Sequence, residues 1–226
     1  EAGSQLVVGS PDGPVYYTTD GSDPRGTRGG VSPSATPFQG TVTTSTLLDG
    51  DSPCRYHVPA NDALGLSWTA RAGQFDDSNW SEGTGGIGFE SGRDLSGLID
   101  TDVGDEMKNI NASCYVRYHF ELDDPDSIVK AILSIHSDAG FVAYLNGVEI
   151  GNLLKPAALA WDSATTGNAE RSGGDTTVLH LPEILDLTLA REHLRDGANV
   201  IALHAFNSDV NESDFLIRPE LSVTHV

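Results

Sequence analysis

Short apolar runs with a period of two residues dominate the chain after residue 54. In the segment FVAYLN (141–146), the odd positions are apolar and alternate with Val142, Tyr144 and Asn146. Successive side chains of a strand point to opposite faces of a sheet, so this pattern predicts a strand with two different faces. Asn146 and Gly147 predict a tight hairpin turn directly after it, because both central residues of such a turn need a positive φ. Other β-rich runs are RYHV (55–58), YVRYHFEL (115–122), VKAILSIHS (129–137), GVEIG (147–151), TTVLHL (176–181), NVIALHAFN (199–207) and FLIRPELSV (215–223).

One segment, Leu187–Arg195, has a helical rather than an alternating pattern. Thr188 is expected to cap its first turn, Arg191 suits its C-terminal end, and Gly197 is expected to end it. Many short strands and a single helical turn predict an all-β fold. The best match is an antiparallel two-sheet jelly-roll sandwich.

Residues 1–50 differ in composition from the rest of the chain. VVGSPDGPVYYTTDGSDPRG predicts two short strands with tight turns at two Asp-Gly pairs, the second at Asp20-Gly21. The stretch that follows is rich in Gly, Pro, Ser and Thr and holds one candidate strand, Thr41–Thr46. We therefore expect a β-hairpin appendage and linker over residues 1–50 and the sandwich over residues 51–226.

Acidic residues outnumber basic ones by 33 to 13, which gives a formal net charge of −20. Such a field repels nucleic acid, because phosphate binding needs Lys and Arg gathered on one face. Nucleic-acid binding is therefore excluded. No apolar run approaches the roughly 18 residues needed to span a bilayer, so membrane insertion is not expected.

Cys54 and Cys114 are the only cysteines. A disulfide between them would close a loop of about 60 residues and stabilise the fold by roughly 4 kcal/mol in the chain-entropy model. An even number of cysteines fits such a bridge in an exported protein. The alternative is two separate buried thiols that behave as small apolar side chains. The sequence leaves both possibilities open.

The segments YYTTDGSDPR (16–25) and SPSATPFQG (32–40) carry the first resemblance to a known family. They are similar to the C-terminal domain of the chitobiase/β-hexosaminidase type, a small β-sandwich appended to secreted bacterial proteins. Only these two segments match, so residues 1–50 resemble part of such a domain.

Three segments of the larger part carry a second resemblance: SWTARAGQFDDSNW (67–80), SDAGFVAYLNGVEIG (137–151) and DGANVIALHAFN (196–207). They resemble the galactose-binding-like jelly rolls at the ends of many bacterial glycoside hydrolases. The resemblance covers residues 55–226 and implies an extracellular or cell-surface location within a large secreted protein. Because this fold serves sugar binding, peptide binding and scaffolding alike, the resemblance specifies the fold more than the function.

Trp161 is the best candidate for ligand binding. It lies in the longest irregular stretch (153–176), beside Asp162 and close to Glu170 and Arg171. An indole offers a face on which a sugar can stack, while carboxylate and guanidinium groups bind hydroxyls, often in bidentate geometry. The alternative is a Trp that folds down to cover the end of the sandwich.

Two further aromatic positions have a structural and a functional interpretation. Tyr144 and Asn146 share one face of their strand, and Tyr144 could contact a ligand if the opposite face is the core. A solvent-facing aromatic on the outer sheet is the alternative. Trp80 follows a turn at Asp76-Asp77, and we interpret it as a residue that staples the two sheets rather than as a sugar platform.

Alternating acidic residues predict a structural calcium site. Asp100, Asp102 and Asp105 are the favoured ligands, and Asn207–Asp214 is a second candidate segment. Calcium takes six to eight oxygen ligands, and both segments offer carboxylates at alternate positions. Neither segment matches the EF-hand loop.

Catalysis is not expected. No HExxH, GxSxG or P-loop pattern is present, and His119, His136 and His204 lie in predicted strands, where an imidazole usually has a structural role. The sequence predicts a non-catalytic carbohydrate-binding or adhesion module of a secreted multi-domain bacterial protein. The alternative is a purely structural spacer or docking domain, whose partners are neighbouring domains of a large surface protein.

Overall fold

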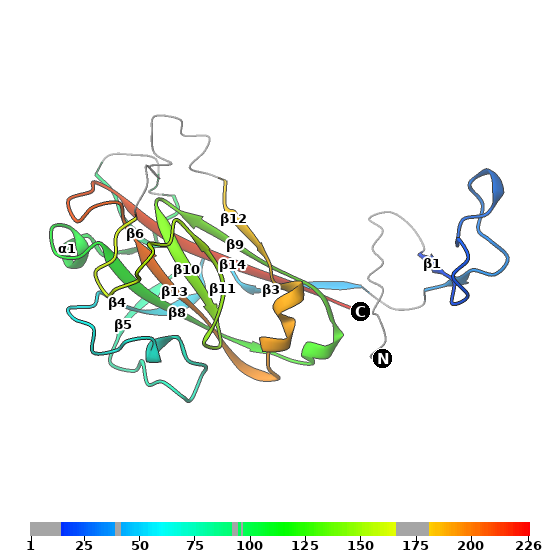
Figure 1. Ribbon diagram of the computed structural model, residues 1–226, viewed down its shortest axis with the longest axis horizontal. Coiled ribbons are helices and arrows are strands. Elements are labelled where there is room, and N and C mark those ends of the chain that lie inside the picture. Colours follow the sequence, from blue (N-terminus) through cyan, green and yellow to red (C-terminus); the bar gives the residue numbers. More distant parts are fainter. Residues whose placement is uncertain (1–14, 39–41, 92–94, 96, 166–180) are drawn as a thin grey trace. The chain divides into compact units, whose positions relative to one another are not determined.

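The computed structural model describes residues 15–38, 42–91, 95, 97–165 and 181–226 (Figure 1). The chain divides into two compact units. The first comprises Glu1–Thr43 together with His225–Val226, and the second comprises Thr44–Thr224. The candidate sites all belong to the second unit.

The first unit contains a two-stranded antiparallel sheet. Strand β1 (Tyr16–Tyr17) pairs with β2 (Thr36–Pro37), and the helical turn η1 (Thr27–Gly29) lies between them in the sequence. The turn expected at Asp20-Gly21 is present, because Asp20 Oδ1 accepts a hydrogen bond from Ser22 N at 2.9 Å and Gly21 has a φ of 80°. The other expected Asp-Gly turn, at residues 12–13, lies outside the described residues.

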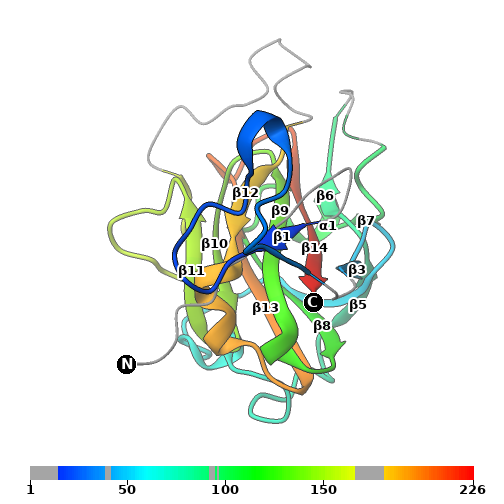
Figure 2. The ribbon, with the colours of Figure 1, turned by 90° about the vertical axis from the view of Figure 1, so that its right-hand side faces the viewer.

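The second unit is an all-β sandwich, as predicted. Sheet I has the strand order β11-β10-β13-β8-β4-β5, and Figure 2 shows β10, β13 and β8 side by side. Sheet II has the order β12-β9-β14-β6-β7, and β3 also pairs with β14. The strands of sheet I are β4 (Pro53–His57), β5 (Ser81–Thr84), β8 (Ser113–Leu122), β10 (Gly140–Leu145), β11 (Val148–Leu153) and β13 (Gly197–Phe206). Those of sheet II are β3 (Thr43–Leu48), β6 (Ile87–Phe89), β7 (Thr101–Asp102), β9 (Ile128–Ser137), β12 (Glu183–Asp186) and β14 (Phe215–His225).

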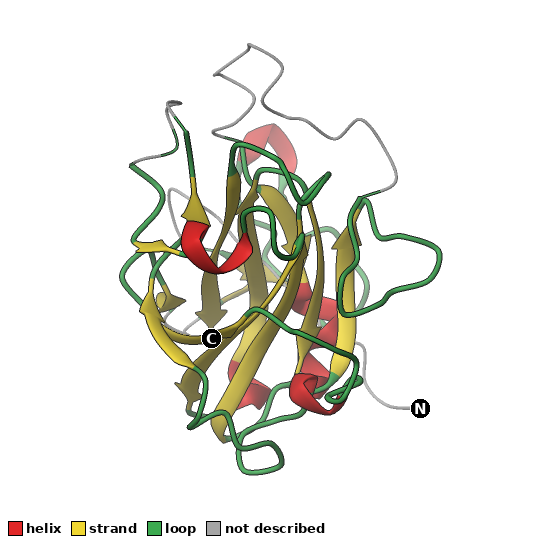
Figure 3. Ribbon diagram, turned by 90° about the vertical axis from the view of Figure 1, so that its left-hand side faces the viewer, coloured by secondary structure: helices red, strands yellow, loops and turns green. Residues whose placement is uncertain are grey.

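Short helical segments connect these strands, and Figure 3 shows how few there are in the part of the chain that is described. They are η2 (Ser67–Thr69), α1 (Gly104–Met107), η3 (Pro125–Ser127) and η4 (Leu187–His193). Neighbouring strands run antiparallel in both sheets, as between β10 and β13 and between β9 and β12, whereas β6 and β7 pair in parallel. The expected strand TTVLHL lies outside the described residues, apart from Leu181.

A first core fills the space between the two sheets. Phe141, Ala143 and Leu145 of β10 face it, together with Phe215 and Ile217 of β14. These side chains are completely or almost completely buried. The odd positions of residues 141–146 therefore form the inner face that the alternation predicts.

A second core lies on the opposite, outer face of sheet I. It contains Val142 and Tyr144 of β10 together with Trp68, Trp80 and Tyr115. Trp68 stacks on the Tyr115 ring, with the ring centroids 4.2 Å apart. The segment of residues 59–80 thus covers the outer face of the sheet. The prediction that Trp80 staples the two sheets is wrong, because Trp80 packs outside sheet I rather than between the sheets.

The prediction that Leu187–Arg195 is helical is confirmed, but the capping residue is not Thr188. The segment is a 3-10 helix, η4, and Asp186 caps it by accepting a hydrogen bond from Thr188 N at 2.9 Å. The acceptor is thus the carboxylate of Asp186, two residues before Thr188, and not the Thr188 side chain. Gly197 begins β13 with a φ of 80°, three residues after the C-cap Leu194.

The register of sheet I excludes a disulfide between Cys54 and Cys114. Cys54 of β4 lies opposite Tyr118 of β8, so Cys114 is four residues away along that strand. At about 3.3 Å per residue, the two Cα atoms are separated by roughly 13 Å, far beyond the reach of a disulfide. Both thiols are free and buried. The alternative of two apolar-like thiols is the correct one.

Candidate functional site

Trp161 and Asp162 occupy the two central positions of a β-turn. Ser163 N donates to Ala160 O at 3.1 Å, and Ala160 N donates to Ser163 Oγ at 2.8 Å. The two hydrogen bonds close the turn from both ends. Ser163 is buried, Trp161 is partly exposed and Asp162 is exposed. The turn therefore presents an indole and a carboxylate side by side at the surface.

Buried polar groups fix this turn to the sandwich. Ser113 Oγ, on β8, donates to Ser163 O at 2.8 Å and lies 3.0 Å from His204 Nε2, on β13. Since the single hydroxyl proton is used on Ser163 O, His204 Nε2 is the donor to Ser113 Oγ. Burial lowers the pKa of His204 to about 3, so the ring is neutral. The structural role expected for His204 is confirmed by these contacts.

Asn111 joins the Trp161 turn to a second loop. Its Nδ2 donates to Pro59 O at 2.6 Å and to Trp161 O at 3.4 Å, while its Oδ1 accepts from Ser113 N at 3.0 Å. Asn111 is buried, and its bonds with Pro59 O and Ser113 N are shielded from water, whereas the longer bond to Trp161 O is partly buried. The loop after Pro59 and the Trp161 turn are consequently held next to each other.

The second loop carries another exposed carboxylate, Asp62. The negative charges of both loops act on Tyr115 of β8. Burial, followed by the charges of Asp62, Tyr144 and Asp162, raises the pKa of Tyr115 to about 12. Among the residues that the structure describes, each of the two loops therefore contributes one exposed carboxylate that acts on Tyr115.

The expected ligand contacts at Tyr144 and Asn146 are wrong. Tyr144 is only 4% exposed, because residues 59–80 cover the face on which it lies. Asn146 has a φ of 52° and is the turn residue that the sequence predicts. Its side chain donates to His193 O and to Asn199 Oδ1, both at 2.8 Å, and accepts from Val200 N at 3.0 Å. These bonds use the amide to hold the hairpin turn, so it is not available to a ligand.

Glu170 and Arg171, the other two residues predicted near Trp161, lie outside the described residues. Their contribution to the site stays a prediction.

The segment that covers the outer face of sheet I is anchored by a buried ion pair. Arg117 of β8 is completely buried, and its Nε donates to Asp77 Oδ2 at 2.6 Å. The same guanidinium donates to Trp68 O and to Ala70 O and lies over the Phe75 ring, 5.2 Å from the centroid. Asp77 therefore belongs to the packing of this segment, as the structural interpretation of the Asp76-Asp77 turn implies.

The predicted calcium ligands use their carboxylates within the chain. Asp100 Oδ2 accepts from Gly86 N at 2.9 Å, and Asp102 Oδ1 accepts from Gly104 N at 2.8 Å. Asp102 and Asp105 line a surface hollow of about 600 Å³ that also contains the ammonium of Lys108. In the part of the chain that is described, no three His, Cys, Asp or Glu side chains gather closely enough to hold a metal ion. Calcium at Asp100, Asp102 and Asp105 stays a prediction.

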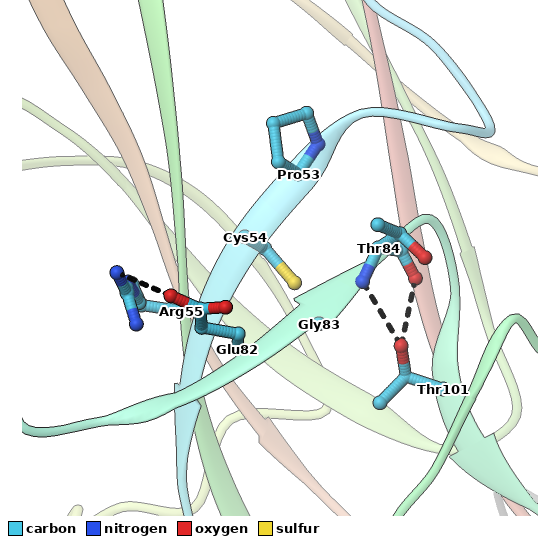
Figure 4. A pocket seen from close by; sticks show the side chains of 7 residues that line it. All are labelled: Pro53, Cys54, Arg55, Glu82, Gly83, Thr84 and Thr101. Atoms are coloured by element: carbon cyan, nitrogen blue, oxygen red, sulfur yellow. Dashed lines mark hydrogen bonds and ion pairs between the residues drawn. The ribbon is translucent and has the colours of Figure 1, made fainter.

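A second hollow, of about 470 Å³, lies at the free edge of β5 (Figure 4). Its rim carries the ion pair between Arg55 and Glu82, with 2.9 Å between Arg55 Nη2 and Glu82 Oε1. Thr101 closes one side, because its Oγ1 accepts from Thr84 N at 2.9 Å and donates to Thr84 O at 3.0 Å. The main chain of Thr84 is thus already paired at this edge, and the hollow offers a ligand few free polar groups.

Comparisons with known proteins give weak likenesses only. No model of a known protein family and no curated protein matches the sequence. Three solved structures illustrate the similarity of the fold. The first is a glycosyl hydrolase family 2 member from Bacteroides cellulosilyticus, with a TM-score of 0.41 and 14% identity over 80% of this chain and 20% of that chain. The second is a β-glucuronidase from an uncultured Clostridium species (TM-score 0.45, 12% identity, 81% and 29% coverage). The third is β-glucuronidase 2 from Bacteroides uniformis (0.46, 13%, 81% and 18%).

This chain spans less than a third of the length of each of those enzymes. With identities this low, the function of the chain has to be argued from its own residues.

Three residues of the site were not predicted from the sequence to belong to it: Asn111 and Ser113, which position the turn, and the exposed Asp62. Asn111, Ser113 and Asp62 come from segments that show no ligand-binding pattern. Asn111 and Ser113 act through buried hydrogen bonds to segments about 50 residues away. Only the folded chain brings those partners together.

Proposed function

We propose that this chain is a non-catalytic carbohydrate-binding module, in which Trp161 stacks on a sugar ring and Asp162 accepts hydrogen bonds from its hydroxyls. One observation supports the proposal above all: the Ala160–Ser163 turn is fixed by buried polar bonds, yet its two central side chains reach the surface. A preformed turn needs little ordering on binding, which lowers the entropic cost of association. An indole with a few well-placed polar groups is a common composition of ligand sites.

The galactose-binding-like resemblance, which covers residues 55–226, supports the same proposal. In modules of this kind, the loops at one end of the sandwich commonly carry the binding site, and Trp161 lies in such a loop. The resemblance also supports a secreted, cell-surface setting within a larger bacterial protein. There the module would hold that protein on its glycan.

Tryptophan fluorescence and calorimetry test the proposal directly. Trp68 is fully buried and Trp80 is 9% exposed, so acrylamide quenching and its relief by a bound glycan report mainly on Trp161. A glycan array identifies ligands, and calorimetry then compares the wild type with Trp161→Ala. We expect the variant to lose binding at least about tenfold, since stacked aromatic contacts dominate such sites.

A matched control separates a site from a general surface effect. Leu189 is 93% exposed and belongs to η4, far along the chain from the Trp161 turn. Leu189→Ala should bind glycan like the wild type. If the wild-type protein binds no glycan, with or without calcium, the carbohydrate-binding role is contradicted.

A structural spacer or docking domain is the second candidate function. The observation that favours it is the second core, in which Trp68 and Trp80 serve packing rather than recognition. If this is the role of the chain, the wild-type protein should bind no glycan on the array. Trp161→Ala should then change the stability of the fold, with no change in glycan binding.

A further inference from the structure

The Trp161 site has a distinct charge, and that charge points to a class of sugar. We propose that the site, if it binds glycans as proposed above, selects units with a free amino group and rejects uronic acid and sulfated units. The inference deepens the proposed function and rests on it. It follows from the two loops that Asn111 holds together.

Each of the two loops joined by Asn111 carries one exposed carboxylate. Asn111 Nδ2 binds Pro59 O in one loop and Trp161 O in the other. Asp62 follows three residues after Pro59, and Asp162 follows directly after Trp161. Both carboxylates are exposed, and the hydrogen bonds of Asn111 hold the loops that carry them next to each other.

The carboxylates of both loops also act on one buried phenol, that of Tyr115 on β8. Its pKa is raised first by burial and then by Asp62, Tyr144 and Asp162. None of the groups acting on Tyr115, among the residues described, is a cation. Two loops from distant parts of the sequence thus each contribute one carboxylate that acts on Tyr115, and one of these loops carries the partly exposed indole of Trp161.

This arrangement discriminates between sugars by charge. An ammonium group on a stacked sugar ring would donate charge-assisted hydrogen bonds to Asp62 or Asp162 and would add a cation–π attraction to the indole. A carboxylate or sulfate on the same ring would be repelled by both loops. Because each contact is solvent-exposed, it is worth up to about fivefold in affinity, so the pair should give about tenfold preference.

Calorimetry with three tetrasaccharides of equal length tests the inference on the full chain. One carries free amino groups, one carries N-acetylated amino groups and one consists of uronic acids. We expect the amino form to bind about tenfold more tightly than the N-acetylated form and the uronic form to show no binding. The preference should shrink as NaCl is raised from about 10 to about 500 mM, because salt screens exposed charges.

Variants separate the site from the general acidity of the protein. Asp62→Asn, which leaves the hydrogen bonds proposed for Asp162 in place, should reduce the preference from about tenfold to about twofold while leaving binding of the N-acetylated form nearly unchanged. Asp51→Asn with Asp126→Asn removes two exposed carboxylates elsewhere and should leave the preference intact.

Each remaining outcome decides a different question. Equal binding of all three tetrasaccharides would overturn the charge selection and leave the proposed function standing. Binding of the amino form that survives Trp161→Ala would also overturn it, since it would reflect attraction to the acidic protein as a whole. Absence of binding by all three tetrasaccharides and by the glycan array would instead contradict the proposed function itself.

Discussion

Arg117 and Asp77 form an ion pair beneath the segment that covers sheet I. The guanidinium is completely buried, the carboxylate is 15% exposed and the Nε–Oδ2 distance is 2.6 Å. His119 Nε2 lies 2.7 Å from the same Oδ2 atom. One carboxylate oxygen therefore neutralises a buried arginine and also contacts a half-exposed histidine. The covering segment is fastened to β8 at this point.

Removal of the carboxylate should destabilise the fold strongly. In Asp77→Ala, Arg117 would keep its buried charge without a counter-ion, which typically costs about 3–5 kcal/mol. Urea unfolding measures the loss. The neighbouring Asp76 provides the control: it is exposed and accepts a hydrogen bond only from Ser78 within its own turn, so Asp76→Ala should cost about 1 kcal/mol or less. Equal losses in the two variants would contradict the role of the ion pair.

Acid should destabilise the protein through His204. Burial lowers the pKa of His204 to about 3, from an ordinary value of 6.5. Between these values the unfolded chain binds a proton that the folded chain does not, so stability falls as the pH falls. The difference of about 3.5 pH units corresponds to about 5 kcal/mol over the whole window, and to about 3 kcal/mol by pH 4.5.

Urea unfolding between pH 7 and pH 4.5 measures this dependence. His204→Asn should be less stable at pH 7, because it disturbs the hydrogen bond to Ser113, but it should lose less stability on acidification. His57, whose pKa burial also lowers, contributes in the same direction and remains in the variant. Parallel pH profiles for the two proteins would show that His204 is not the titrating group.

Gly86 should tolerate no side chain. A Cβ atom there would overlap the carbonyl oxygen of Leu98, where the chain crosses beside β6. Because the obstacle is backbone, Gly86→Ala should destabilise by about 2 kcal/mol or more. Gly97→Ala is the control, since nothing lies within 4 Å of its added Cβ, and it should be neutral or stabilising by up to about 1 kcal/mol. Thermal unfolding of the two variants compares them directly.

Both thiols should be unreactive in the folded protein. Burial raises the pKa of Cys54 to about 12 and the pKa of Cys114 still further above its ordinary value. A thiolate is the reactive form, so neither should react with a thiol reagent until the chain unfolds. We expect two equivalents to react in denaturant and none before it, and reducing agent should leave the melting temperature unchanged. Loss of reactive thiols in denaturant, restored by reduction, would reveal a disulfide after all.

The inner core of the sandwich could be predicted from the sequence, because alternation over several residues fixes which side chains share a face. In β10 the positions 141, 143 and 145 face the first core as expected. What alternation cannot show is whether the other face is also covered. Tyr144 was therefore expected at the surface, whereas it is buried by the segment that carries Trp68. That segment has no regular hydrophobic period, so its position on the sheet is set by the aromatic stacking and by the contacts of Arg117.

The Cys54–Cys114 question and the Trp161 site show a second limit. Both depend on which residues of distant segments lie opposite each other. Cys54 could be placed in a strand but not opposite Tyr118, and Trp161 could be placed in a loop but not beside the Asp62 loop. Register and loop–loop contacts come from long-range packing, which a single sequence does not spell out.

The hydroxyl of Thr101 protects one end of the edge strand β5 from pairing with a strand of another module. At the margin of β5 it satisfies both main-chain groups of Thr84, donor and acceptor, with one side chain. The N–H and C=O groups of Thr84 are therefore not available to a strand of a neighbouring module or of another molecule. Sheet extension by another chain is therefore blocked at the Thr84 end of β5.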